Sequence, residues 1–370
     1  MKFSCDLQLL SDVVSRVSLA ISARSTIPAL EGVLLQCSDN YLQLSGYDLE
    51  IGIIRSIHVD QEEEGGIILN AQLFGEMLRK MRGPEVHIET DERQMTVITD
   101  DDTQFHILGV SKEEFPSIPS FSEEVSFSIP DPFLKKMINQ TIFATAQNQV
   151  QSPILCGSLF DVRDGILHIV SVDGYRVALS KMEVDTKKKF YFVVPSKTLS
   201  EISKLLVDSE ERITKVSVSE KHVVFEIGEY YIISRLLEGE FIDYRSAIPK
   251  ESSTKLQLDA TELRHAIERV SIIINLKNNT PVKMNAADGM IKLSCESTLG
   301  EGKDQFVVQM EGKPIQIAFN NRYMIEALRH CDQEETLILL NGSVEPIKIV
   351  PKEGDDYLFL VLPVRLKTDI

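Results

Sequence analysis

The strongest constraint on the fold of this 370-residue chain is a unit that occurs three times. In each copy an apolar run ends at a residue suited to begin a helix, and apolar residues then recur at helical spacing. The three residues at these helix starts stand at equal steps of 125 residues: Asn70, Pro195 and Asn320. A repeated unit predicts a modular body, so a repeated surface is a better candidate for function than a single catalytic centre.

The copies also begin alike, each with a short alternating run followed by an amphipathic helical stretch. These openings start at Phe3, Phe127 and Leu256. β-Rich segments follow, broken by turn residues such as Asp39-Asn40, Asp164-Gly165 and Asp288-Gly289. The expected unit is a strand, a helix, three strands, a further strand, a second helix and more strands, which is an α+β fold.

Three domains are expected, because the chain is too long for one ordinary core and suits three cores of about 120 residues. Proline-containing links at Phe115–Pro119 and Ile248–Ser253 separate the copies. We therefore predict domains at 1–121, 122–252 and 253–370. In each, two helices would cover antiparallel sheets, and the free sheet edges would let units join. A row of such units can close head-to-tail with a second chain into a ring.

Composition favours an acidic cytoplasmic protein. No apolar run approaches the ~20 residues of a membrane helix, and the first residues do not resemble a secretory signal. Five scattered cysteines without a Cys-x-x-Cys pair predict free thiols in a reducing compartment. The net charge of −17 argues against a chain that binds nucleic acid through its overall charge.

The positive charge is nevertheless unevenly distributed. Basic residues outnumber acidic ones in the six helical stretches, whereas acidic residues gather in turns such as 62–64 and 100–102. One interpretation is six ordinary solvated helix faces with mixed ion pairs. The other places all six helices on a wall that faces a polyanion, and the repeat favours it because symmetry would multiply a weak bias.

Three segments closely match a known family: Ser171–Ala178, Glu238–Arg245 and Leu362–Leu366. With the triple repeat, they show that nearly the whole chain resembles the bacterial DNA sliding clamp, the β subunit of the DNA polymerase III holoenzyme. The resemblance implies a head-to-tail homodimeric ring of six similar domains with helices lining the hole. It implies a processivity factor that encircles duplex DNA without reading its sequence, and that needs no cofactor, no metal and no catalytic residue.

The resemblance also implies where DNA and the second chain bind. It places Arg24 and Gln149 at the DNA, and the charge on the helices adds four further candidates: Arg79, Lys80, Lys197 and Lys204. The implied dimer interface pairs one edge of the first domain with a segment of the partner's last domain. Its residues are Phe105, Ile107 and Leu108 on one side and Ile272 and Ile273 on the other. Three consecutive isoleucines, 272–274, cannot all face one core, which supports this assignment.

A further implied part is an apolar pocket between the central and last domains. It would accept a short peptide from DNA polymerase III α, other polymerases, the clamp loader, and mismatch-repair and ligase-type proteins. Aliphatic walls would bury a Leu or Phe of the partner. The matching positions are Leu155, Val172, Gly174, Tyr175, Arg176, Val177, Ile242, Ala247, Asn320, Tyr323, Val344, Leu360, Val361, Leu362, Pro363, Val364 and Arg365.

The pocket departs from the commonest family pattern at Tyr175, Ile242, Leu362 and Val364, which predicts a narrower and more rigid pocket. The residues themselves leave an alternative for Val361 and Leu362, namely a buried edge strand. The segment 367–370 extends beyond the matched region, and we expect it near the pocket mouth.

Two rival functions stay open at this level. Asp100–Asp102 could hold the metal ions of a nuclease, although its place between alternating segments favours a solvated turn. Leu299–Lys303 only partly matches a phosphate-binding loop and is expected to form a hairpin turn. The second rival is a scaffold that recruits partners through the pocket and never binds DNA.

Overall fold

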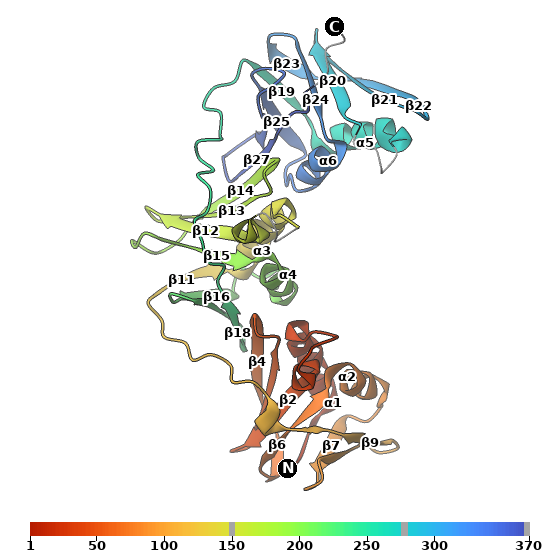
Figure 1. Cartoon of the computed structure of the whole chain (residues 1–370), viewed down its shortest axis with the longest axis vertical. Coiled ribbons are helices and arrows are strands. Elements are labelled where there is room, and N and C mark those ends of the chain that lie inside the picture. Colours follow the sequence, from red (N-terminus) through yellow and green to blue (C-terminus); the bar gives the residue numbers. More distant parts are fainter. Residues whose placement is uncertain (148–151, 275–279, 366–370) are drawn as a thin grey trace. The chain divides into compact units, whose positions relative to one another are not determined.

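The computed structural model describes residues 1–147, 152–274 and 280–365 (Figure 1). They form two compact units, one of residues 1–134 and 200–236 and the other of residues 135–199 and 237–370. The middle third of the chain therefore contributes strands to both units. Among the described helices, none has the length and apolar character needed to cross a membrane.

The predicted order of elements is present in the second copy, whereas the first and third copies each have five strands, one more than predicted, between their two helices. The first comprises β1 (Lys2–Asp6), α1 (Leu7–Val17), β2 (Gly32–Ser38), β3 (Tyr41–Tyr47), β4 (Ile51–His58), β5 (Asp60–Glu63), β6 (Gly65–Asn70), α2 (Ala71–Lys80), β7 (Glu85–Thr90), β8 (Met95–Thr99), β9 (Gln104–Leu108) and β10 (Val110–Ser111). The second comprises β11 (Val125–Pro130), α3 (Asp131–Thr141), β12 (Gly157–Arg163), β13 (Ile166–Val172), β14 (Arg176–Glu183), β15 (Phe190–Pro195), α4 (Ser196–Leu205), β16 (Ile213–Val218), β17 (His222–Ile227) and β18 (Tyr230–Arg235). The third comprises β19 (Thr254–Asp259), α5 (Ala260–Val270), β20 (Val282–Ala287), β21 (Met290–Ser297), β22 (Gly300–Val307), β23 (Gln309–Gly312), β24 (Ile315–Phe319), α6 (Asn321–Arg329), β25 (Glu335–Leu340), β26 (Ile347–Pro351) and β27 (Tyr357–Val361).

Local sequence chemistry explains why the copies match. The hairpins β2–β3, β12–β13 and β20–β21 turn at Asp39-Asn40, Asp164-Gly165 and Asp288-Gly289, and all six residues have positive φ. Such two-residue turns suit the twist of paired strands and favour Asn, Asp and Gly. The predicted helix starts are also confirmed, since the Asn70 and Asn320 side chains accept backbone N–H bonds at the starts of α2 and α6.

In the first unit, strands from the first and second copies join in one sheet. Its order is β10-β6-β2-β3-β4-β18-β17-β16-β11, and the β4–β18 pairing connects the copies. A second sheet has the order β5-β1-β7-β8-β9 and leaves β9 at one edge. Helices α1 and α2 lie side by side (Figure 1), and α1 buries its apolar stripe, including Leu10 and Val14.

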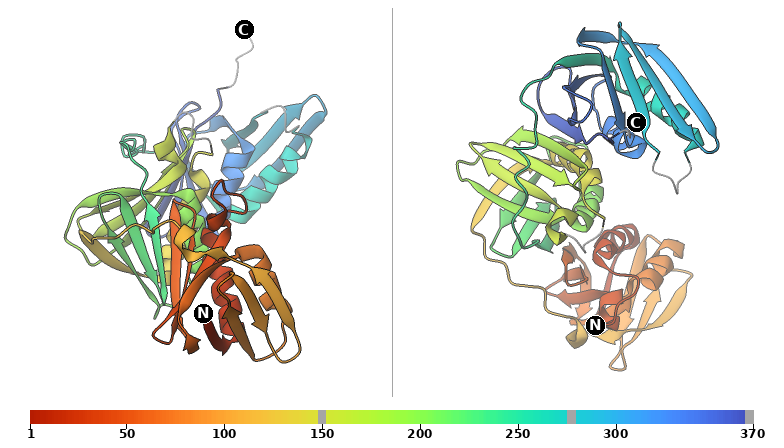
Figure 2. Two further views of the ribbon diagram at one scale, coloured as in Figure 1. Left: turned by 60° about the horizontal axis from the view of Figure 1, so that its bottom comes forward. Right: turned by 45° about the horizontal axis from the view of Figure 1, so that its top comes forward.

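The second unit follows the same plan. Its larger sheet has the order β15-β12-β13-β14-β27-β26-β25-β19-β23, so the β14–β27 pairing joins the second and third copies. Val361 is buried in β27, but β27 lies between β14 and β26, so the edge-strand alternative for Val361 is wrong. The smaller sheet, β22-β21-β20-β24, leaves β22 at an edge, and Figure 2 shows α5 packed against the long β21–β22 hairpin.

Candidate functional site

The floor of a candidate groove lies in the second unit on neighbouring strands. Val172 of β13, Val177 of β14 and Leu360 of β27 are buried in one apolar cluster, and Leu155 packs against it. Because these strands are adjacent in one sheet, side chains on the same face form a continuous apolar layer. Four of the residues that the resemblance implied are therefore brought together by the fold.

Exposed apolar side chains border this floor. Tyr175 is 61% exposed and Leu362 is 41% exposed, and the Leu362 N–H donates to the Tyr175 carbonyl oxygen at 2.9 Å. The Tyr175 ring stacks on the Tyr323 ring with centroids 5.9 Å apart. Ile242 is also exposed, on the segment 238–248 that packs over the same cluster. An open apolar border above a buried apolar floor suits an apolar peptide side chain.

Arg176 is a buried charged residue beside the groove border. It is 5% exposed, and its guanidinium donates to Asp173 Oδ2 at 2.8 Å, to the Phe143 carbonyl oxygen at 2.6 Å and to the Glu326 carboxylate. The guanidinium also lies 4.6 Å from the Tyr323 ring centroid. The resemblance implied Arg176 as part of the pocket, and in the structure its guanidinium is hydrogen-bonded to other groups of the protein beside the Tyr323 ring.

The remaining pocket positions occupy distinct roles. Gly174 has φ of 88°, a left-handed conformation that favours glycine. Asn320 caps α6, and the half-buried Val364 donates its N–H to the Ala318 carbonyl oxygen at 2.8 Å. Pro363 is half-buried, and three further positions are exposed: Ala247, Val344 and Arg365.

The described DNA candidates are exposed. Arg24 follows the short helical turn Ser18–Ala20, and Arg79 and Lys80 end α2. Lys197 and Lys204 lie on α4, where Lys204 Nζ contacts Glu201 Oε2 at 2.7 Å. Gln149 and the segment 367–370 lie outside the described residues. Exposed cations on helices are compatible with a weak phosphate-facing surface.

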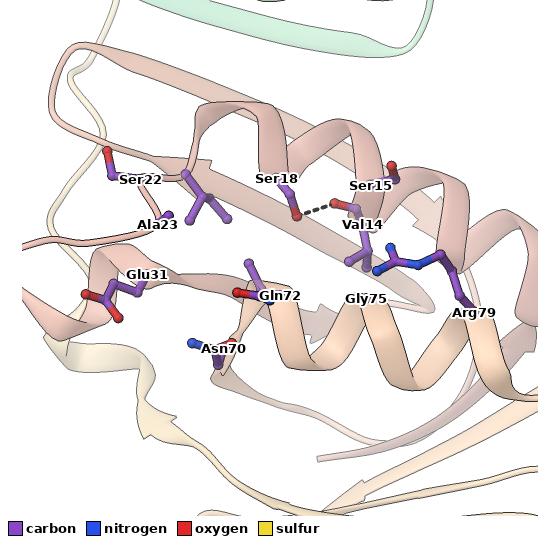
Figure 3. Close-up of a pocket in the computed structure, with 12 residues that line it drawn as sticks. Val14, Ser15, Ser18, Ser22, Ala23, Glu31, Asn70, Gln72, Gly75 and Arg79 are labelled. Atoms are coloured by element: carbon purple, nitrogen blue, oxygen red, sulfur yellow. Dashed lines mark hydrogen bonds between the residues drawn. The ribbon is translucent and has the colours of Figure 1, made fainter.

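Arg79 also borders a cavity of about 220 Å³ between α1 and α2. Figure 3 shows its side chain reaching toward Val14 and Gly75. A Cβ at position 75 would come within 3.2 Å of Arg79 Nη1, so the glycine leaves room for this arrangement. Part of the Arg79 side chain is therefore used in helix packing.

The predicted dimer positions differ in exposure. Ile272 is 80% exposed and Leu108 is 66% exposed, so both are available to a partner. Ile273 packs partly against the core of its own unit. Ile107 is only 5% exposed and lies on the covered face of its sheet. The half-buried Phe105 lies on the same face of β9. The side chains that point outward from this part of β9 are His106 and Leu108.

Sequence reasoning missed a buried polar cluster next to the groove. The Asp161 carboxylate, 1% exposed, is bonded by Tyr244 and Arg245 from the segment 238–248. Two features of the sequence point to this cluster. Asp161 is an acidic residue inside the otherwise apolar run of β12, and Tyr244 and Arg245 belong to the family-matching segment Glu238–Arg245, of which only Ile242 had been placed in the pocket.

The rival site at Asp100 is a structural turn. Its carboxylate accepts the backbone N–H groups of Arg82, Gly83, Asp102 and Thr103 at 2.7–3.1 Å. The N–H donors of Arg82 and Gly83, above all, hold the pKa of Asp100 well below its usual range. Within the described ranges no three His, Cys, Asp or Glu side chains are grouped to hold a metal. The hairpin turn between β21 and β22 consists of Thr298 and Leu299, so only Leu299 of the predicted segment 299–303 lies in it, and Gly300–Lys303 belong to β22.

We expect Asp100→Asn to destabilise the first unit at pH 7, because an amide NH₂ would face N–H donors that a carboxylate oxygen now accepts. A depressed folded-state pKa stabilises the fold above the unfolded pKa of about 4, and this stabilisation is lost as pH falls through the folded value. The difference in urea midpoint between the variant and the unaltered chain should therefore shrink below about pH 4. Asp101→Asn, at an exposed neighbour, is the control, and equal effects of both variants would contradict this account.

Comparisons with known proteins cover nearly the whole chain. Three family models match in order: the N-terminal, central and C-terminal domains of the DNA polymerase III beta subunit, at residues 1–119, 128–243 and 245–365. A beta sliding clamp of Bacillus subtilis is 31% identical over 378 aligned positions, which cover 99% of this chain and 100% of that protein. The crystal structure of the DNA polymerase sliding clamp from Bacillus subtilis superposes with a TM-score of 0.95 at 31% identity, covering 99% of each chain. A DNA polymerase III beta subunit from Thermotoga maritima gives a TM-score of 0.92 at 26% identity and covers 99% of each chain.

Proposed function

Because the chain belongs to the family of bacterial DNA sliding clamps, the β subunits of DNA polymerase III, we propose that two copies close head-to-tail around duplex DNA. The observation that carries this proposal is the match of three successive family domains to a chain that repeats one unit three times. The open edges of β9 and β22, with Leu108 and Ile272 exposed nearby, support closure through these two ends.

The ring would hold DNA by enclosure. Helix residues Arg79, Lys80, Lys197 and Lys204, with Arg24, would supply a weakly basic lining in an otherwise acidic protein. Few phosphate contacts favour sliding, because each tight contact must break before the duplex can move. Such a clamp acts as an accessory subunit in the cytoplasm, without catalytic activity of its own.

The groove in the second unit would tether partners. Its floor of Val172, Val177 and Leu360 and its border of Tyr175 and Leu362 suit a short apolar peptide. DNA polymerase III α, other polymerases, the clamp loader, and mismatch-repair and ligase-type proteins are the proposed carriers of this peptide.

We further propose clamp domains at 1–121, 122–252 and 253–370, a division into structural repeats that differs from the two compact units.

The enclosure proposal predicts that binding depends on DNA topology. The labelled chain, loaded on nicked circular plasmid by its clamp loader and ATP, should co-elute with the plasmid at a salt concentration that removes simple electrostatic binding. Cutting the plasmid once should release the chain, because a ring slides off a free end. The same plasmid re-circularised before loading is the control.

Three outcomes discriminate the functions. Release after the single cut supports enclosure. Retention on linear DNA would indicate adhesion instead, and a chain that binds the partner peptide but is never retained on circular DNA would indicate a scaffold. Degradation of DNA on addition of Mg²⁺ or Mn²⁺ would favour the nuclease alternative.

A further inference from the structure

A buried carboxylate anchors the segment 238–248 beside the groove. Asp161 on β12 accepts three bonds: from Arg163 Nε at 2.8 Å, from Arg245 Nη2 at 2.6 Å and from the Tyr244 hydroxyl at 3.2 Å. Burial alone would raise the pKa of Asp161, but the Arg163 hydrogen bond and the Arg245 charge outweigh it and lower the pKa. Burial, with Asp161 nearby, raises the pKa of Tyr244 to about 12, so its hydroxyl stays a donor at neutral pH.

The Asp161–Arg245 ion pair ties this segment to the sheet through charge. Arg163 belongs to the same strand as Asp161, whereas Tyr244 and Arg245 belong to a segment that contains neither helix nor strand. The Tyr244 ring is also 3% exposed and lies in the apolar cluster with Val177 and Leu360. The position of Tyr244 is therefore set by two groups at once, the apolar cluster around its ring and the carboxylate at its hydroxyl.

The backbone of Tyr244 is hydrogen-bonded to two exposed residues, Ile242 and Ala247. The Tyr244 N–H donates to the Ile242 carbonyl oxygen at 2.8 Å, and the Ala247 N–H donates to the Tyr244 carbonyl oxygen at 3.2 Å. Ile242 and Ala247 are both exposed, and both are pocket positions implied by the family resemblance. A displacement of Tyr244 or Arg245 would consequently move both exposed residues relative to the groove floor.

An open pocket also lies beside the segment. A cavity of about 350 Å³ lies between β12 and residues 240–245, and it is lined by Leu159, Asp161, Arg163 and Tyr191 from the sheet side. A well-packed interior would hold the segment in place by contact alone. Here there is free volume beside it, so the polar anchor has more influence on its position.

We propose that Asp161 is a positioning residue for partner binding: it holds Tyr244 and Arg245, and through them fixes Ile242 and Ala247 as one border of the groove. This inference rests on the proposed peptide-binding function. A border that is fixed before the partner arrives removes an ordering cost from binding, so its loss weakens affinity without removing any residue that contacts the peptide.

The test is peptide affinity, measured by fluorescence anisotropy with a labelled peptide of DNA polymerase III α. Asp161→Asn, which keeps shape and removes charge, should weaken binding about tenfold, the loss expected when one apolar contact is no longer presented. Arg245→Met should reproduce this loss at a half-exposed position where folding is less at risk. Arg163→Gln is the matched control, because Arg163 shares the Asp161 carboxylate but is not part of the moving segment, and its affinity should stay within about twofold.

A second measurement separates positioning from general damage. In a chain that already carries Ile242→Ala and Ala247→Gly, Asp161→Asn should change affinity by less than about twofold, because the residues through which it acts are gone. Equal losses in both backgrounds would assign Asp161 a purely structural role. If the unaltered chain binds the peptide and neither Asp161→Asn nor Arg245→Met weakens binding, the positioning proposal alone is overturned. If the unaltered chain does not bind the peptide, the proposed peptide-binding function fails first and the positioning role with it.

Discussion

The Ile272→Asp chain is expected to be monomeric at concentrations at which the unaltered chain is a dimer. Ile272 lies in the helical turn η6 (Ser271–Ile273) and is 80% exposed, so little of its apolar surface is buried within one chain. The turn contacts the edge strand β22, and Leu299, which directly precedes that strand, is 72% exposed. An apolar patch beside an unpaired strand edge is a surface that a second chain would cover.

The expected effect is large because the substitution acts twice. It removes apolar area from the interface and places a carboxylate where no partner for it is provided, which together cost about 3 kcal/mol or more, or at least about a hundredfold in dimer affinity. Sedimentation velocity over a dilution series measures this. Ile213→Asp, at a 59% exposed isoleucine of β16, is the control and should leave the dimer intact.

Ile272 and its neighbour Ile273 differ in their surroundings, so only Ile272 is substituted. Ile273 packs partly against the core of its own unit, so truncating it would weaken the fold as well as the interface. If the Ile272→Asp chain sediments as a dimer at every dilution, this surface is not part of the ring closure.

The Arg176→Met substitution is expected to destabilise the second unit by about 3–5 kcal/mol, the loss typical of removing one partner from a buried charged group. Arg176 donates to Asp173, Glu326 and the Phe143 carbonyl oxygen, and Met would fill the space but satisfy none of them. Burial alone would raise the pKa of Glu326, whereas the hydrogen bonds from Arg322 and Arg176 lower it, so the carboxylate stays charged at pH 7.

Arg322→Gln is the matched control, because Arg322 donates to the same Glu326 carboxylate at 2.9 Å from a side chain that is 70% exposed. An exposed pair contributes about 1 kcal/mol or less. Urea unfolding followed by tyrosine fluorescence suits both variants, since the chain has no tryptophan. Equal stability of the two variants would show that the buried network around Arg176 contributes little.

The repeat, the order of elements and the hairpin turns were predictable because each depends on neighbours close in sequence. Asp39-Asn40 and Asp288-Gly289 form turns through their own backbone preferences. The Asn70 and Asn320 side chains cap the helices that follow them by accepting N–H groups two or three residues further along the chain. The family resemblance then supplied the groove positions, four of which the fold gathers into one layer.

The environment of other residues comes from distant parts of the chain and could not be predicted from their neighbours in sequence. Alternation places Ile107 and Leu108 on opposite faces of β9, but it does not say which face is covered, and the fold covers Ile107. Arg176 and Asp161 are charged residues that sequence composition assigns to the surface. They are buried because Glu326 and Arg245, which lie 150 and 84 positions away, come within bonding distance. Local preference therefore sets where helices, strands and turns occur, whereas the burial and pairing of a side chain depend on contacts that exist only after the sheets have assembled.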